Sequence, residues 1–222
     1  MEKVSDMLAL CPLFFKIRQE DMGAMLSCLH AKRKSFSKGE IILGEGAPAD
    51  LVGVVLSGAV HVVREDYFGN RSMMAKLGPC DLFAEAFALA GVESMPVNVI
   101  AAESCEVILI DISRISRPCA KACSFHQQMI YNLMRILALK NLACNQKIEV
   151  TSKRSTREKL MAYLLLQAKR AKSGSFIIPF DRQELADYLE VDRSGLSSEI
   201  GKLRREGILD CVKNRFTINM PL

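Results

Sequence analysis

The chain has 222 residues, of which half are hydrophobic, and its formal net charge is +5. This length allows one large domain or two modest ones, each able to bury a core. No uninterrupted apolar run approaches the ~20 residues of a membrane-spanning helix, and the N-terminus carries early charges of both signs. We therefore expect a cytoplasmic protein without a membrane span or a signal peptide.

The charge is distributed unevenly along the chain. Residues 1–112 hold ten Lys or Arg against fifteen Asp or Glu, and residues 113–148 hold six basic residues and no acidic one. Residues 149–222 hold fourteen basic residues against ten acidic ones. An acidic front and a basic back are typical of a nucleic-acid reader with a separate sensing domain.

The first half of the chain has the pattern of short helices followed by many strands. Residues 7–10 and 19–28 fit short helices, and β-rich runs broken by glycine begin at residue 35. Such strands predict a small antiparallel barrel or roll. The expected strands are residues 41–43, 51–56, 59–64, 72–77, 97–101 and 106–111, with a helical insert at 83–90.

A long helix is predicted at residues 124–148, where neither Gly nor Pro occurs. A line of side chains close to a heptad seam runs along it: Ile130, Leu133, Leu137, Lys140 and Cys144. One helix could bury this line against its own domain. A long helix that joins a sensor domain to a DNA-binding domain is more simply explained as the dimerisation helix. We therefore predict that these residues form the seam of a homodimer.

The predicted linker between the domains is residues 149–154. Ser155 and Glu158 then form a capping-box pattern that opens a helix, which ends by Gly174. Residues 176–180 follow as a short edge strand because Pro179 interrupts them.

Residues 180–209 have the pattern of two short helices joined by a tight turn. Asp181 and Glu184 can form a capping box on the first helix, and Asp192 can cap the second. The second helix carries a buried stripe of Leu196, Ile200 and Leu203, and Gly207 is placed to end it.

The opposite face of this second helix gathers cationic and hydroxyl side chains: Arg193, Ser194, Ser197, Ser198, Lys202 and Arg205. Arg can bind guanine O6 and N7 in the major groove, and small polar groups allow close approach. Two apolar runs then flank Lys213, Asn214 and Arg215, as in a β-hairpin wing whose basic tip contacts phosphates. The alternative is a helical hairpin of another kind of domain. Caps, turn, apolar register and wing together favour DNA binding.

The order of these parts resembles the CRP/FNR family of bacterial transcription regulators. The resemblance covers essentially the whole chain, and the helix-turn-helix match is its most specific part. It is carried by Gly39, Glu45-Gly46, Ser57-Gly58, Gly78, residues 81–85, Cys105-Glu106-Val107, residues 182–186 and Asp192-Arg193-Ser194.

The resemblance implies an α+β fold in three parts. These are an antiparallel, jelly-roll-like β-roll sensor at residues 1–112, a dimerisation helix at 113–148 and a winged helix-turn-helix at 149–222. It also implies a homodimer on a palindromic operator, an effector in the β-roll and RNA polymerase as a further partner.

For the DNA contacts, the resemblance assigns the base-reading role to Arg193. Ser194 and Ser198 stand where relatives often have Glu and Arg, so we expect a different half-site. Gln183 matches a position near the phosphates, and Arg182 beside it completes the predicted DNA-binding set.

The effector site departs from the cyclic-AMP-binding pattern of the family. Glu85 persists, but the preceding Gly is Ala84, and the Arg-Ser pair that holds the phosphate aligns with Met95-Pro96. Residues 83–98 contain no Lys or Arg to balance a phosphodiester anion. We therefore expect no cAMP binding and propose a small apolar or neutral effector. The predicted pocket is Phe83, Ala84, Glu85, Phe87, Met95, Pro96, Val97 and Asn141.

The eight cysteines are expected to be reduced thiols rather than a disulfide framework. Cys11, Cys28 and Cys105 cannot complete the cluster of the iron–sulfur members of the family, and we expect Cys105 to be a buried structural thiol. Cys119 and Cys123 lie four residues apart and could face one way on a helix turn, but a lone pair of cysteines is more often inert than a metal site. We predict no metal or cofactor, and redox switching through Cys11 or Cys211 stays open.

Three functions can be compared on this basis. The first is an effector-controlled DNA-binding regulator. The second is a β-roll sensor or interaction module without productive DNA binding, or a cysteine-based redox regulator of the same fold. The third is an enzyme, which we reject because the sequence contains no P-loop, GxGxxG, GxSxG or HExxH motif.

Overall fold

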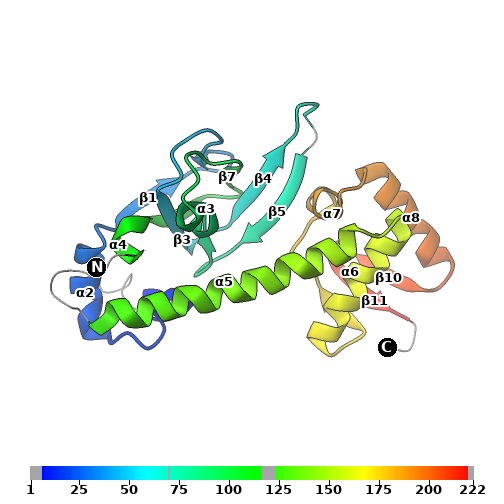
Figure 1. The fold of residues 1–222 in the computed structure, drawn as a ribbon. Helices are drawn as coiled ribbons and strands as arrows, with labels where there is room; N and C mark the ends of the chain where they lie inside the picture. Colours follow the sequence, from blue (N-terminus) through cyan, green and yellow to red (C-terminus); the bar gives the residue numbers. More distant parts are fainter. Residues whose placement is uncertain (1–6, 70, 117–123, 220–222) are drawn as a thin grey trace. The chain divides into compact units, whose positions relative to one another are not determined.

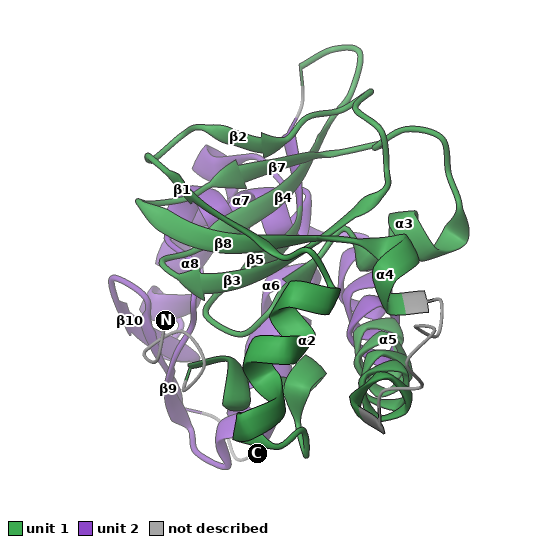
Figure 2. Cartoon of the chain, turned by 90° about the vertical axis from the view of Figure 1, so that its left-hand side faces the viewer, with its two compact units in different colours: residues 1–70, 74–141 green, residues 71–73, 142–222 purple. Residues whose placement is uncertain are grey.

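The computed structural model describes residues 7–69, 71–116 and 124–219 (Figure 1). It divides into two compact units, one of residues 1–70 and 74–141 and the other of residues 71–73 and 142–222 (Figure 2). The predicted boundaries after residues 112 and 148 do not coincide with this division. Helix α5 (Ser124–Thr151) begins in the first unit and ends in the second.

Two four-stranded antiparallel sheets form the β-roll, as predicted. One sheet has the order β1 (Lys32–Phe36), β8 (Cys105–Asp111), β3 (Leu51–Ser57) and β6 (Leu82–Phe83). The other has the order β2 (Ile41–Leu43), β7 (Asn98–Ala101), β4 (Val60–Glu65) and β5 (Arg71–Leu77). The start of β1 was missed because Lys32, Arg33 and Lys34 are charged and exposed, as is common on a sheet edge.

Strands β3 and β8 are buried on both faces. Val55, Val107 and Leu109 contribute to a core with residues of the second sheet, such as Val99. Their neighbours Val52, Val54, Ile108 and Ile110 point to the other face, into a core shared with the N-terminal segment. Burial on both faces explains why these strands are almost continuously apolar rather than alternating.

The N-terminal segment fills the space between this sheet and the first half of α5. It contains the 3₁₀ turns η1 (Pro12–Phe14) and η2 (Gln19–Asp21) and helix α2 (Met22–Cys28). Its apolar side chains share one core with Phe125, Met129, Leu133 and Ile136 of α5. Short helices α3 (Glu85–Ala90) and α4 (Ile112–Ser116) complete the unit (Figure 1).

The second unit has the winged helix-turn-helix architecture. Helices α6 (Thr156–Ala171), α7 (Arg182–Leu189) and α8 (Arg193–Arg205) pack on a sheet of order β10 (Leu209–Val212), β11 (Arg215–Ile218) and β9 (Ser175–Ile177). Both predicted capping boxes are present. The side chains of Ser155 and Asp181 each accept a hydrogen bond from the backbone N–H of the glutamate three residues later. The side chain of that glutamate accepts a hydrogen bond from the backbone N–H of the capping residue.

Two sequence-based expectations differ from the structure. Helix α5 runs to Thr151, so the predicted linker at residues 149–154 is partly helical. The expectation that all cysteines are free is wrong, because Cys11 and Cys80 form a disulfide. These residues lie 69 positions apart, so no local pattern indicated the pairing. Cys119 and Cys123 lie outside the described residues.

A search of the described helices found no stretch with the length and apolarity that crossing a membrane requires.

Candidate DNA-binding surface and effector site

The helix pair of the second unit is held together by its predicted apolar stripes. Leu185, Ala186 and Leu189 of α7 are buried, as are Leu196, Ile200 and Leu203 of α8. Gly207 follows α8 with a φ of 72°, in the left-handed region that glycine adopts without steric cost. Burial of this apolar stripe therefore determines which side chains of α8 face outward.

Asp192 caps α8. Its carboxylate accepts from the Gly195 backbone N–H at 2.8 Å and also from the Ser194 hydroxyl. The hydrogen bond from Ser194, followed by that from Gly195, lowers the pKa of Asp192. The Ser194 proton is thus used within the cap, which leaves its oxygen as an acceptor.

The exposed face of α8 carries little bulk. Arg193, Ser197, Ser198, Lys202 and Arg205 are all exposed, and the Lys202 ammonium lies 3.3 Å from Glu199. A Cβ built on Gly195 would meet its nearest neighbour at 3.7 Å, and one on Gly201 would meet nothing within 4 Å. The fold itself therefore does not require these two glycines. Because they lack side chains, other groups can approach this face of the helix more closely.

Arg182, which belongs to the predicted DNA-binding set, contacts side chains of the wing. It is partly buried, with its guanidinium carbon 5.8 Å from the centre of the Phe216 ring and Nη2 3.8 Å from Cys211 Sγ. These contacts tie Arg182 to the wing, and its contact with DNA stays a prediction. Gln183 is exposed and donates to the Asp187 carboxylate at 2.7 Å.

The wing tip consists of two residues in the turn and one at the start of β11. Lys213 has a φ of 55° in the turn, and Lys213 and Arg215 are exposed. Asn214 donates to the Ile178 carbonyl at 3.1 Å, which ties the turn to the segment after β9. Two cations are therefore displayed, and Asn214 positions them.

The predicted effector residues differ in their burial. Phe83, Ala84, Met95 and Val97 are buried in the core of the roll, whereas Pro96 and Asn141 are exposed and Phe87 is partly buried. A Cβ on Gly53 would lie 1.9 Å from the Phe83 ring, so the ring occupies the space beside that glycine. Four of the residues expected to line an effector site thus pack in the core of the roll.

Glu85 is buried and forms an ion pair with Lys140 of α5. The Lys140 ammonium lies 2.8 Å from Glu85 Oε1 and 2.5 Å from the Leu82 carbonyl oxygen. The second carboxylate oxygen is buried and has no hydrogen-bond partner within the described residues. Residues 83–98 lack a cation, but the fold brings one from 55 positions away, which the sequence pattern could not reveal.

The residues of the predicted dimer seam lie on one side of α5, and part of that side contacts the unit in which the helix begins. Leu133 is 4% exposed and packs in the core of its own unit, and Lys140 binds Glu85. Ile130 and Leu137 are partly buried, and Cys144 is exposed. The exposed apolar side chains lie elsewhere on the helix: Tyr131, Met134, Leu139, Leu142 and Ile148.

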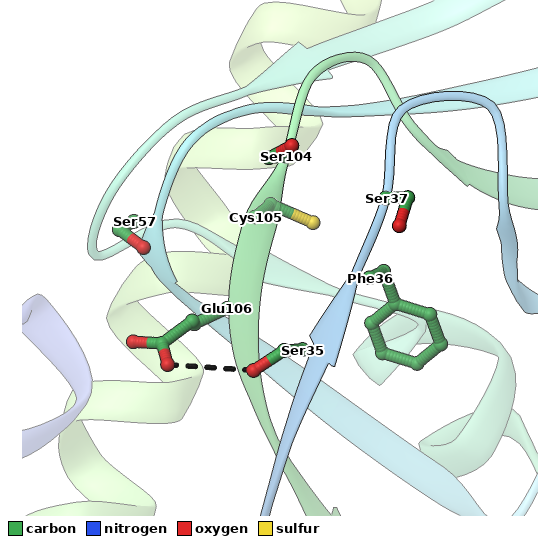
Figure 3. A pocket seen from close by; sticks show the side chains of 7 residues that line it. All are labelled: Ser35, Phe36, Ser37, Ser57, Ser104, Cys105 and Glu106. Atoms are coloured by element: carbon green, nitrogen blue, oxygen red, sulfur yellow. Dashed lines mark hydrogen bonds between the residues drawn. The ribbon is translucent and has the colours of Figure 1, made fainter.

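A further pocket of about 410 Å³ lies where β1 and β8 approach the end of β3 (Figure 3). It is lined by Phe36, Cys105, Glu106 and four serines, none of them in the predicted effector set. Cys105 is buried, as expected, and burial raises the pKa of its thiol. Among the described residues, no group of three or more His, Cys, Asp or Glu side chains could hold a metal ion.

Two family models match the chain. The cyclic nucleotide-binding domain matches residues 33–121, and the Crp-like helix-turn-helix domain matches residues 158–221. The cyclic AMP receptor protein of Thermus thermophilus is 24% identical over 201 residues, which cover 89% of this chain and 88% of that protein. The transcriptional activator protein FnrL of Cereibacter sphaeroides is 21% identical over 194 residues, covering 83% and 75%.

Solved structures have the same fold. FixK2 from Bradyrhizobium japonicum has a TM-score of 0.65 at 24% identity, covering 86% of this chain and 93% of that one. The regulator CLP of Xanthomonas campestris has a TM-score of 0.72 at 16% identity, covering 90% and 100%. With a nucleotide-binding-like roll followed by a Crp-like DNA-binding domain, the chain belongs to the CRP/FNR family of transcription regulators, which are not enzymes.

Proposed function

We propose that the protein is a cytoplasmic homodimer that binds a palindromic operator and is controlled by an effector other than cAMP. RNA polymerase is the further partner that this role implies. The observation that carries the proposal is the exposed face of α8, where Arg193 and small hydroxyl side chains stand on a helix fixed by a buried stripe.

This face suits the major groove for two reasons. Within the described residues Arg193 has no recorded ion-pair or hydrogen-bond partner, so its guanidinium is available for guanine O6 and N7. Ser197, Ser198 and Gly201 are small, so bases can approach the helix closely. Lys213 and Arg215 on the wing would contact phosphates and add salt-dependent affinity.

The dimer contact that the exposed side chains support is not the predicted seam. Tyr131, Met134 and Leu142 are 60%, 57% and 60% exposed and recur at helical spacing on one side of α5. A second copy related by a twofold axis would bury the same face on both helices. Two recognition helices could then read half-sites one helical turn apart.

The contacts of Glu85 argue against cAMP. Its carboxylate is paired with Lys140, and the segment that holds the phosphate in relatives is Met95-Pro96 here. A phosphodiester placed there would lose its hydration without gaining a fixed cation. A small apolar or neutral effector carries no charge, so it avoids this cost of lost hydration. It would still have to displace the packed Phe83 or Met95 side chains.

Replacing Arg193 by Ala tests the reading role of α8. Selection from random-sequence DNA should enrich a palindrome, and Arg193→Ala should weaken binding to it by about 1–3 kcal/mol and relax one position of each half-site. The measurement is a gel-shift titration at fixed salt. Lys169→Ala, which removes an equal charge from an exposed site on α6, is the control. Failure to enrich any palindrome at low salt would instead favour a module without productive DNA binding.

Charge placed on the exposed face of α5 should separate the copies. Met134→Glu combined with Leu142→Glu is expected to convert a dimer to a monomer at micromolar concentration, because each copy would bring two carboxylates into the interface, where they lose their hydration. Analytical ultracentrifugation gives the mass. Ile177→Glu, at a site on β9 that is also 60% exposed, should leave the dimer intact. A wild-type protein that is already monomeric would refute the proposal.

Addition of cAMP or cGMP is expected to leave the melting temperature unchanged, since Glu85 is already paired. Thermal shift titrations of the intact protein measure this, and the cyclic AMP receptor protein of Thermus thermophilus serves as a positive control. Saturable stabilisation by either nucleotide would contradict the proposal, because a ligand that binds the native state raises its stability.

A further inference from the structure

Cys11 and Cys80 bring two distant parts of the first unit together. Cys11 is fully buried in the N-terminal segment, directly before η1. Cys80 is partly exposed in the turn between β5 and β6, and its α-carbon lies 4.5 Å from that of Cys11. Cys80 is therefore the more exposed residue of the pair.

The surroundings accommodate both the bonded and the thiol form of the pair. The Met7 carbonyl oxygen lies 3.5 Å from Cys11 Sγ and 3.7 Å from Cys80 Sγ, so it can accept from either thiol when the bond is open. The turn that carries Cys80 is held independently of the sulfur. The Cys80 N–H donates to Val55 at 2.8 Å, and the Gly78 N–H donates to Asp81 at 2.9 Å.

Each cysteine lies next to a contact that holds α5. Two and four residues after Cys11, the carbonyl oxygens of Leu13 and Phe15 accept from Asn132 of α5 at 2.9 and 2.8 Å. Two residues after Cys80, the carbonyl oxygen of Leu82 accepts from Lys140 of α5 at 2.5 Å. The disulfide therefore joins the two chain segments to which α5 is attached.

We propose that Cys11 and Cys80 are a reversible oxidation site whose bond fastens these two attachment segments to each other and so sets how firmly α5 is held. The effect on DNA rests on the proposed function, because α5 continues to Thr151 and leads into the DNA-binding unit. The formation of the bond and the hold on α5 do not depend on it.

A hydroperoxide is a small oxidant, and it suits a pair in which one cysteine is partly exposed and the other is buried. The Cys80 thiolate attacks the terminal oxygen of the hydroperoxide and breaks its O–O bond, which gives Cys80 sulfenic acid and releases hydroxide from hydrogen peroxide or an alkoxide from an organic hydroperoxide. The Cys11 thiol then attacks that sulfur, so that the S–S bond forms and water leaves with the proton of the thiol. A cellular dithiol reverses the change by thiol–disulfide exchange and becomes oxidised to its own disulfide.

The first experiment follows the bond itself in the intact protein. Fully reduced protein is titrated with hydrogen peroxide, and free thiols are alkylated before peptide mass mapping. We expect the Cys11–Cys80 bond to form first and to reopen with dithiothreitol. It should also form in Cys144→Ser and Cys211→Ser, which alter exposed or partly exposed thiols outside the pair. If Cys11 and Cys80 both remain alkylatable while other cysteines oxidise, the site is refuted.

The second experiment measures the consequence of the bond. Hydrogen exchange of residues 7–17 and 124–141 should be slower in oxidised than in reduced wild type, and affinity for the selected operator should differ at least five-fold between the two forms. Cys80→Ser and Cys80→Ala should abolish both differences, with circular dichroism confirming that they fold.

The outcomes separate the two proposals. Slower exchange without DNA binding in either form would refute the proposed function and support the oxidation site. Equal operator affinity in both forms would refute a link between the bond and DNA binding. Exchange that is unchanged by oxidation would show that the bond does not control α5.

Discussion

The organisation of the first unit depends on how one long helix is attached to it. Helix α5 places Phe125, Met129 and Ile136 in an apolar core, and that burial supplies most of the stabilisation. Apolar packing alone is not directional. The register of α5 is set by Asn132, which donates to two carbonyl oxygens of the N-terminal segment, and by Lys140 between Leu82 and Glu85. A helix displaced by one turn would leave these groups buried without partners, at a cost of about 1–3 kcal/mol for each neutral group.

Because this attachment uses one face of α5, the opposite face is left outside. Tyr131, Met134 and Leu142 are exposed on the same helix whose other side is buried. The polar contacts thus determine which side chains a second copy would meet. The disulfide acts on the same elements, since Cys11 precedes the segment that Asn132 binds and Cys80 precedes the one that Lys140 binds.

Features determined by neighbouring residues could be predicted from the sequence. The capping boxes at Ser155 and Asp181, the cap at Asp192 and the stripe of α8 each depend on positions three to seven residues apart, and the structure confirms them. The strands of the roll were also found, because glycine turns separate them. The charged start of β1 was not, since its exposed lysines lack the apolar pattern of a strand.

Features that depend on distant contacts could not be predicted. The pairing of Glu85 with Lys140 spans 55 residues, and that of Cys11 with Cys80 spans 69. An apolar line at helical spacing does not show whether it faces its own domain or a partner, so the contacts of Leu133 and Lys140 with their own unit could not be predicted. The contact of the Arg182 guanidinium with the Phe216 ring, which lies 34 positions further along the chain, could likewise not be predicted.

The central claim is that specific polar contacts, and not apolar burial alone, hold α5 to the sensing unit. Hydrogen exchange of the Asn132→Leu variant tests it most directly, because leucine keeps the volume and removes both hydrogen bonds. The account predicts faster exchange in residues 7–17 and in the first half of α5, with α6, α7 and α8 unchanged. Unchanged exchange in α5 would contradict it and would show that packing by itself fixes the helix.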